Sequence, residues 1–212
     1  MTLDPITQKM LKGKVNEVKT LVQTALDENN APDDILKALT AAMDIIGERF
    51  SSNQAFIPEI MMAARVMNEA LIILKPHLQG KADNSRGRAV ICTVKGDCHD
   101  IGKNLVKIML EGAGVEVLDL GTNVPSEKII SALKETGIKV LCLSALLTTT
   151  MPMQKDVIDK LKAEGMKDDI KVFVGGAPVT REYAESIGAD GYAEDAASAA
   201  RMINKLFRRS TE

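Results

Sequence analysis

The sequence predicts an α/β protein in which an N-terminal four-helix bundle is followed by a doubly wound, parallel five-stranded sheet. The prediction depends on a change of period near Arg88. Before this residue, apolar residues recur every three or four positions, which indicates amphipathic helices. After it, short runs of Val, Leu and Ile alternate with turns and helical patterns. Such alternation is typical of a parallel sheet with helices on both faces.

Four helices are expected in the first 78 residues. A short one precedes Gly13, and the second covers residues 14–28. Pro32 lies near the start of the third, because proline is favoured in the first turn of a helix. A polar break at residues 51–56 separates it from the fourth, which begins at Pro58. The inward stripe of the fourth helix is expected to contain Ile60, Met61, Ala64, Met67, Leu71 and Leu74.

The polar, glycine-containing stretch at residues 79–87 is interpreted as a linker. It separates a helical domain at residues 1–78 from a sheet domain at residues 88–212. About five strands fit a flavodoxin-like or Rossmann-like doubly wound sheet. The expected strands are residues 88–94, 116–120, 140–144, 171–175 and 191–193.

Small and polar residues gather where these strands end. In a doubly wound sheet, ligands bind outside the carboxyl ends of the strands. The segments at these ends are residues 96–102, 144–150, 175–180 and 193–196. We therefore expect the functional site at this edge.

Composition excludes several classes of protein. Hydrophobic residues make up 45% and charged residues 26% of the chain, the balance of a globular protein. A net charge of -2 and 3% aromatic residues argue against nucleic-acid or membrane-surface binding. No stretch approaches the roughly 18 apolar residues of a membrane span, and the first residues resemble no targeting signal. The cysteines, Cys92, Cys98 and Cys142, form no C-x-x-C pair and predict reduced thiols in a cytoplasmic protein.

His99 lies in the first edge segment, Gly-Asp-Cys-His-Asp-Ile-Gly, which contains the pattern Asp-x-His-x-x-Gly. A loop between a strand and a helix can present an imidazole to a ligand above the sheet edge. Neutral imidazole is a good ligand for a late first-row metal such as cobalt. A metal-bound histidine usually has a carboxylate on its other ring nitrogen, and Asp97 could fill that role.

Glycines and hydroxyl side chains occur at the same edge. Glycine lets a large flat ligand come close, because it has no side chain. The glycines are Gly96, Gly102, Gly175 and Gly176. The hydroxyl side chains are Ser144, Thr148, Thr149 and Thr150.

Three motifs in order carry a family resemblance. Asp97–Gly102 is followed by Ser144–Leu146, with the pattern Ser-x-Leu, and then by Gly175–Gly176. The chain resembles the cobalamin-binding module of methionine synthase and, more closely, the free-standing corrinoid proteins of methyltransferase systems. The stretch Ile46–Met67 is similar to the helical cap domain that precedes this module. The resemblance therefore covers nearly the whole chain.

The resemblance implies a cobalamin or related corrinoid cofactor, methylated in turnover, whose own base is detached from cobalt and buried in the sheet domain. His99 would replace that base as the lower axial ligand. Asp97 would hydrogen-bond His99, and the Thr150 hydroxyl would extend this relay. Ser144 would contact the buried base, and Gly175–Gly176 would make room for the nucleotide tail.

The helical domain is implied to cover the upper, methyl-bearing face of the cofactor through Phe50 and Ile57. Cycling of cobalt would move His99 on and off the metal, and the His99–Asp97 pair could take up a proton when the imidazole is released. The implied cofactor-binding residues are Phe50, Ile57, Gly96, Asp97, Cys98, His99, Asp100, Ile101, Gly102, Ser144, Leu146, Thr148, Thr150, Gly175, Gly176 and Ala177, with His99 as the metal ligand.

The implied function is that of a methyl carrier. A substrate-specific methyltransferase would methylate the cobalt, and a second methyltransferase would pass the methyl group to a thiol or a folate. A reductive activation protein would be a further partner. The chain would act as a subunit of this system and not as a catalyst alone. Methanol, methylamines, betaines and aryl methyl ethers all remain open as donors.

Other functions are weighed against the methyl carrier. The cobalamin subunit of a carbon-skeleton mutase shares the sheet domain, but the helical cap argues against it. A cobalamin-dependent regulator would add a DNA-binding domain, and a metal-free flavodoxin-like module is the fourth alternative. A zinc site is disfavoured because no further Cys or His cluster completes about four ligands. A hydrolase triad is disfavoured because the pattern G-x-S-x-G is absent around Ser144.

Overall fold

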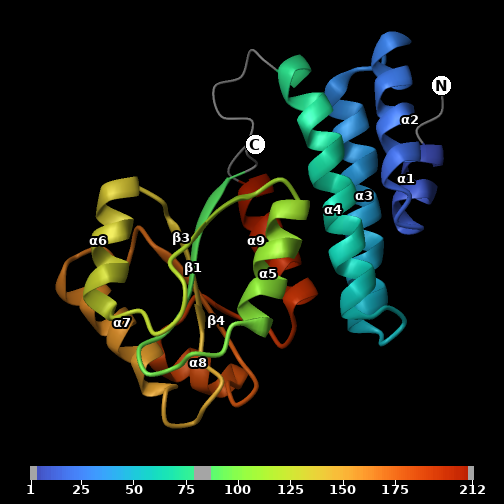
Figure 1. Ribbon diagram of the computed structural model, residues 1–212. Coiled ribbons are helices and arrows are strands. Elements are labelled where there is room, and N and C mark those ends of the chain that lie inside the picture. Colours follow the sequence, from blue (N-terminus) through green and yellow to red (C-terminus); the bar gives the residue numbers. More distant parts are fainter. Residues whose placement is uncertain (1–3, 79–86, 210–212) are drawn as a thin grey trace.

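The computed structural model describes residues 4–78 and 87–209, and Figure 1 shows a helical part beside a layered sheet part. Pro32 is the first residue of the third helix, as expected. Of the predicted linker at residues 79–87, only Gly87 lies within the described residues, so the domain boundaries stay a prediction. The N-terminal elements are α1 (Asp4–Leu11), α2 (Val15–Asp27), α3 (Pro32–Ser51), α4 (Ile57–Leu74) and the 3-10 turn η1 (Lys75–Leu78).

The C-terminal part is a five-stranded parallel sheet with the order β2-β1-β3-β4-β5. This is the flavodoxin-like order, and it confirms the predicted fold class. The strands are β1 (Arg88–Thr93), β2 (Glu116–Asp119), β3 (Val140–Ser144), β4 (Lys171–Gly175) and β5 (Gly191–Tyr192). The helices are α5 (Ile101–Gly112), α6 (Ser126–Thr136), α7 (Pro152–Ala163), α8 (Arg181–Ile187) and α9 (Ala196–Arg209).

Helices cover both faces of the sheet, and successive residues of a strand alternate between the faces. In β1, Ala89 and Ile91 belong to the core next to α5 and α9, whereas Val90 and Cys92 belong to the core next to α6, α7 and α8. The strand is apolar on both sides because neither face meets solvent. Parallel pairing places the carboxyl ends of the strands at one edge, where the predicted site lies.

The helical bundle packs against α5 and α9 through α3 and α4 (Figure 1), and buried residues of both parts form one apolar cluster. Two glycines, Gly47 and Gly112, permit the close approach of the helical bundle to the sheet domain. A Cβ atom at Gly112 would lie 2.5 Å from Met43 Cε, and one at Gly47 would lie 3.0 Å from Met109 Cε. This packing brings the end of α3 to the sheet domain.

The predicted inward stripe of α4 is wrong at Met61, whose exposed fraction is 54%. Met61 lies on the outer side of the helix with Ile57 and Ile72, which are also exposed. Most positions of α4 are apolar, so the spacing of apolar residues alone does not identify the buried side. The other predicted positions do pack against the core: Ile60, Ala64, Met67, Leu71 and Leu74.

Candidate cofactor-binding site

The loop that carries His99 connects β1 to α5 and is held from two sides. The Thr93 hydroxyl, at the end of β1, donates to the His99 carbonyl oxygen at 2.8 Å. The Asn123 N–H donates to the Asp97 carbonyl oxygen at 2.8 Å, and the Asn123 side-chain oxygen accepts from the Gly96 N–H at 2.7 Å. Gly96 has a φ of 82°, in the left-handed region that glycine adopts without strain. The loop therefore presents His99 at the carboxyl edge of the sheet.

Asp97 is the buried centre of the site and has no exposed surface. Its Oδ1 atom accepts from the His99 backbone N–H at 3.0 Å and lies 2.7 Å from the imidazole Nδ1. Its Oδ2 atom accepts from the Leu146 N–H and from the Thr150 hydroxyl, each at 2.7 Å. The structure thus brings together the three side chains of the predicted relay, those of Asp97, His99 and Thr150.

The His99 ring is oriented by this carboxylate. Because Nδ1 faces Asp97 Oδ1, we assign the ring proton to Nδ1 and the free lone pair to Nε2. The His99 side chain is 51% exposed and lines a cavity. Nε2 can therefore reach a ligand in that cavity while Asp97 holds the opposite side of the ring.

Asp97 is held as a carboxylate. Burial raises the pKa of Asp97, but the hydrogen bonds from Leu146, Thr150 and His99 lower it by more, and the pKa lies well below its ordinary value. A carboxyl group with a depressed pKa stabilises the folded state above its unfolded pKa of about 3.9. That stabilisation is lost as the pH falls toward the folded pKa.

Replacing Asp97 by Asn should therefore destabilise the protein most near neutral pH. We expect the free energy of unfolding to fall by about 2–3 kcal/mol at about pH 7, because buried donors lose an anionic acceptor. The difference from the unmodified protein should shrink below about pH 4, and urea unfolding across this range measures it. Asp100→Asn changes an exposed carboxylate in the same loop and serves as the control. A difference that does not change with pH would contradict this assignment.

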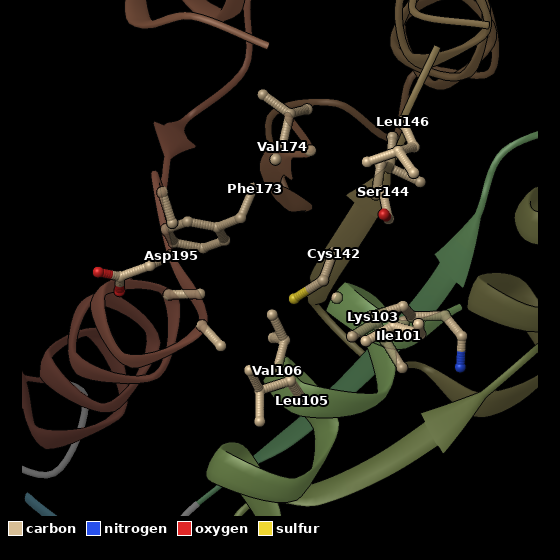
Figure 2. A pocket seen from close by; sticks show the side chains of 18 of the residues that line it. Ile101, Lys103, Leu105, Val106, Cys142, Ser144, Leu146, Phe173, Val174 and Asp195 are labelled. Carbon is tan, nitrogen blue, oxygen red and sulfur yellow. The ribbon is translucent and has the colours of Figure 1, made fainter. Parts of the chain in front are cut away.

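A cavity of about 600 Å³ opens beside His99 and extends along the sheet face that α5 and α9 cover (Figure 2). This volume lies within the range of small-molecule and cofactor sites. Most of the predicted site residues line it. They are Phe50, Cys98, His99, Asp100, Ile101, Gly102, Ser144, Leu146, Gly175, Gly176 and Ala177.

The remaining predicted residues do not line this cavity. Asp97 and Thr150 are buried behind the His99 ring, where they hold it. Gly96 belongs to the turn that positions the loop. Thr148 is exposed in the loop after β3, and Ile57 begins α4 with 41% of its surface exposed. Ile57 and Thr148 therefore do not line this cavity, and their implied contacts with the cofactor stay predictions.

The backbone conformation at position 176 and the neighbouring loop after β3 both require glycine there. Its φ is 127°, and a Cβ atom there would lie 1.8 Å from the Ala145 carbonyl oxygen. At Gly175, a Cβ atom would lie 3.2 Å from the Ala193 carbonyl oxygen. Sequence reasoning explains both glycines by the room that a ligand needs, but at Gly176 the backbone of the loop after β3 takes that space.

Several cavity residues have no counterpart among the sequence predictions. Ile91, Cys142 and Phe173 line the cavity from the middle of their strands, and Figure 2 shows Cys142 and Phe173. Val106 and Ile203 line it from the helices. An apolar residue in a buried strand or helix has the pattern of ordinary core, so no local signal separates these positions from the rest of the core.

Lys103 is a further residue without a local sequence signal. Its side chain is only 3% exposed, and its Nζ lies 2.6 Å from Asp119 Oδ2 at the end of β2. Burial raises the pKa of Asp119, but Lys103, the Gly121 N–H and Lys107 together lower it by more, so this carboxyl group stays charged. The buried ion pair fixes the first turn of α5 against the sheet edge, next to the loop of His99.

The donor atoms of the site fit a metal that is held mainly by its own macrocycle. Within the described parts of the chain, no group of three or more His, Cys, Asp or Glu side chains could hold a metal ion. One oriented imidazole at the mouth of a large, mostly apolar cavity can instead supply a single axial ligand.

The same described residues include no helix long and apolar enough to cross a membrane. Fold and site together define a cofactor-binding α/β protein with a helical cap.

The comparisons with known proteins agree with this class. Residues 87–201 match the family model "B12 binding domain", and residues 2–75 match a second model with the same description. Dimethylamine corrinoid protein 1 of Methanosarcina acetivorans is 40% identical over 206 residues, which cover 97% of each chain.

Two solved structures are similar over most of the chain. One is a cobalamin-binding protein from Desulfitobacterium hafniense, with 33% identity, a TM-score of 0.84, and coverage of 96% of this chain and 98% of that one. The other is a chain in the structure of the methanol:cobalamin methyltransferase complex MtaBC from Methanosarcina barkeri, with 30% identity, a TM-score of 0.82, and coverage of 97% of this chain and 79% of that one. The chain belongs to the B12-binding corrinoid proteins of methyltransferase systems, and its cofactor is a corrinoid. The predicted family and cofactor are confirmed.

Proposed function

We propose that this protein carries a methyl group on the cobalt of its corrinoid, from a substrate-specific methyltransferase to a second methyltransferase with a thiol or folate acceptor. The observation that carries the proposal is the single imidazole of His99, oriented by Asp97 at the mouth of the cavity. The bound cobalt supplies the group that accepts and releases the methyl group, which is the chemistry of the cofactor itself.

The chain's own residues would bind and orient the cofactor and keep water away from it. His99 Nε2 would hold the cobalt in place of the cofactor's own base, while Asp97 holds the proton on Nδ1. Thr150 donates to the second Asp97 oxygen and so fixes the carboxylate. The cavity that α5 and α9 cover, which Ser144 also lines, would receive the nucleotide tail of the cofactor. Phe50, from the end of α3, lines the cavity and would shield the cofactor from the side of the cap.

The donor is recognised by the partner enzyme. One similar structure is a methanol:cobalamin methyltransferase complex, and one relative is named a dimethylamine corrinoid protein. Methanol and methylamines are therefore the first donors to test, before betaines and aryl methyl ethers. Because the cap residue Phe50 lines the cavity, we expect the cap to move aside for each partner. A reductive activation protein completes the proposed system, which operates in the cytoplasm, where the free cysteines stay reduced.

Methylation of the cobalt by purified methyltransferases tests the proposed function. The apoprotein is loaded with cobalamin, reduced, and mixed with methyltransferases specific for methanol, monomethylamine or dimethylamine and with the matching donor. We expect one enzyme to change the absorbance spectrum of the bound corrinoid, and the loaded protein to transfer the methyl group to a thiol in a second step. Failure of the apoprotein to retain any corrinoid would refute the proposal.

A further inference from the structure

The inner end of the cavity is a row of three side chains across the sheet. Ile91, Cys142 and Phe173 are aligned neighbours in β1, β3 and β4, and all three line the cavity. Cys142 precedes Ser144 by two residues on the same face of β3, so the row lies about 7 Å deeper than the Ser144 hydroxyl. We call Ile91, Cys142 and Phe173 the floor row.

The floor row offers a ligand little hydrogen bonding. The backbone groups of the strands lie in the plane of the sheet, where neighbouring strands pair with them. Val106 and Ile203 add apolar carbon atoms from the helix side. Figure 2 shows the Cys142 sulfur pointing toward the space bordered by Phe173 and Val106. Burial raises the pKa of Cys142 to about 12, so this group is a neutral thiol, a weak donor and a weak acceptor.

We propose that the floor row selects the base on the nucleotide tail of the corrinoid, favouring benzimidazole over adenine, and that Cys142 sets the depth available to that base. The proposal rests on the proposed function, because it takes this cavity as the site of the tail. The inner edge of a benzimidazole carries C–H or methyl groups, which pack against apolar side chains. Against the floor row, the exocyclic amine of adenine would meet only the weak acceptor of Cys142, and a buried donor without a good acceptor is unfavourable.

Binding of three corrinoids to the unmodified apoprotein tests the selection. The probes are a corrinoid with dimethylbenzimidazole, one with adenine, and cobinamide, which has no nucleotide tail. From the absorbance change, we expect the dimethylbenzimidazole form to bind about tenfold or more tightly than the adenine form. Equal affinities, or tighter binding of adenine, would overturn the selection. If cobinamide and both complete corrinoids fail to bind, the proposed function itself is refuted.

Two substitutions at Cys142 test its role in depth and polarity. Cys142→Leu adds carbon atoms to the floor row and should weaken binding of the dimethylbenzimidazole form about tenfold, with cobinamide binding unchanged. Cys142→Ser supplies a hydroxyl acceptor, so it should reduce the preference against adenine. If Cys142→Leu weakened cobinamide binding equally, or Cys142→Ser left the preference unchanged, contact between Cys142 and the base would be ruled out.

Cys92 provides the matched control. It is also a fully buried thiol in the middle of the sheet, but it belongs to the cluster on the opposite face. Cys92→Leu and Cys92→Ser should perturb thermal stability as much as the Cys142 variants while leaving the base preference unchanged.

A readout that does not depend on affinity is alkylation of Cys142, followed by mass spectrometry. A complete corrinoid should slow this reaction more than cobinamide does, and equal rates would overturn the placement of the base.

Discussion

If His99 holds the cobalt as proposed, replacing His99 by Ala should remove the nitrogen ligand while the corrinoid stays bound. In the reconstituted cobalt(II) protein, we expect the nitrogen splitting from histidine to disappear from the electron spin resonance spectrum. The affinity for the corrinoid should fall about 10- to 100-fold, the range found when the residues that support a metal ligand are mutated. Binding should not be abolished, because in the proposed arrangement the cavity that α5 and α9 cover would still hold the nucleotide tail.

His77 is the control for this substitution, because the chain contains only two histidines. His77 is exposed on η1 and does not line the cavity, so His77→Ala should leave the spectrum and the affinity unchanged. Free imidazole added to the His99→Ala protein should restore a nitrogen splitting, since the cavity mouth has room where the ring was. Persistent histidine splitting in the His99→Ala protein would show that another ligand lies beneath the metal.

The sequence predicts the elements of this fold well because its two halves have different periods. In the sheet domain, two-sided burial makes each strand a continuous apolar run, and glycine or polar residues mark both of its ends. The predicted runs at residues 140–144 and 171–175 coincide with β3 and β4. The site loop is equally predictable, because Asp97 and His99 are polar residues at the end of a buried strand. Such residues have little reason to occur there unless they are hydrogen-bonded or functional.

The sequence predicts less well which side chains of a helix, strand or loop are buried and which ones face the site. Met61 and Ile60 are both apolar, and only the packing of α4 on its neighbours decides which of them is buried. Within its own strand, Cys142 has the pattern of a core residue. It lines the cavity because the helices α5 and α9 leave a space over this part of the sheet. Thr148 and Thr150 both carry hydroxyls, but the turn after β3 points only Thr150 at Asp97. These distinctions depend on tertiary contacts that have no counterpart in local spacing.

Replacing Gly176 by Ala should destabilise the protein more than any other single methyl addition in the cavity wall. The residue has a φ of 127°, where a side chain is strained, and the added Cβ atom would lie 1.8 Å from the Ala145 carbonyl oxygen. Strain and forced displacement of the loop after β3 together should lower the free energy of unfolding by about 3 kcal/mol or more. For a chain of this length, the melting temperature should fall by roughly 6–12 °C, measured by circular dichroism.

Two other glycines separate the contributions to this effect. Gly121 also has a positive φ, 90°, but no atom lies within 4 Å of the place that its Cβ atom would take, so Gly121→Ala reports strain alone. Gly102, in the first turn of α5, also has nothing within 4 Å, and Gly102→Ala should raise stability by about 0.5–1 kcal/mol. Because Gly102 lines the cavity, that variant should nonetheless bind the corrinoid more weakly. The Gly176→Ala protein should melt at a lower temperature than the Gly121→Ala protein. If it does not, the close contact with Ala145 is not the reason that position 176 requires glycine.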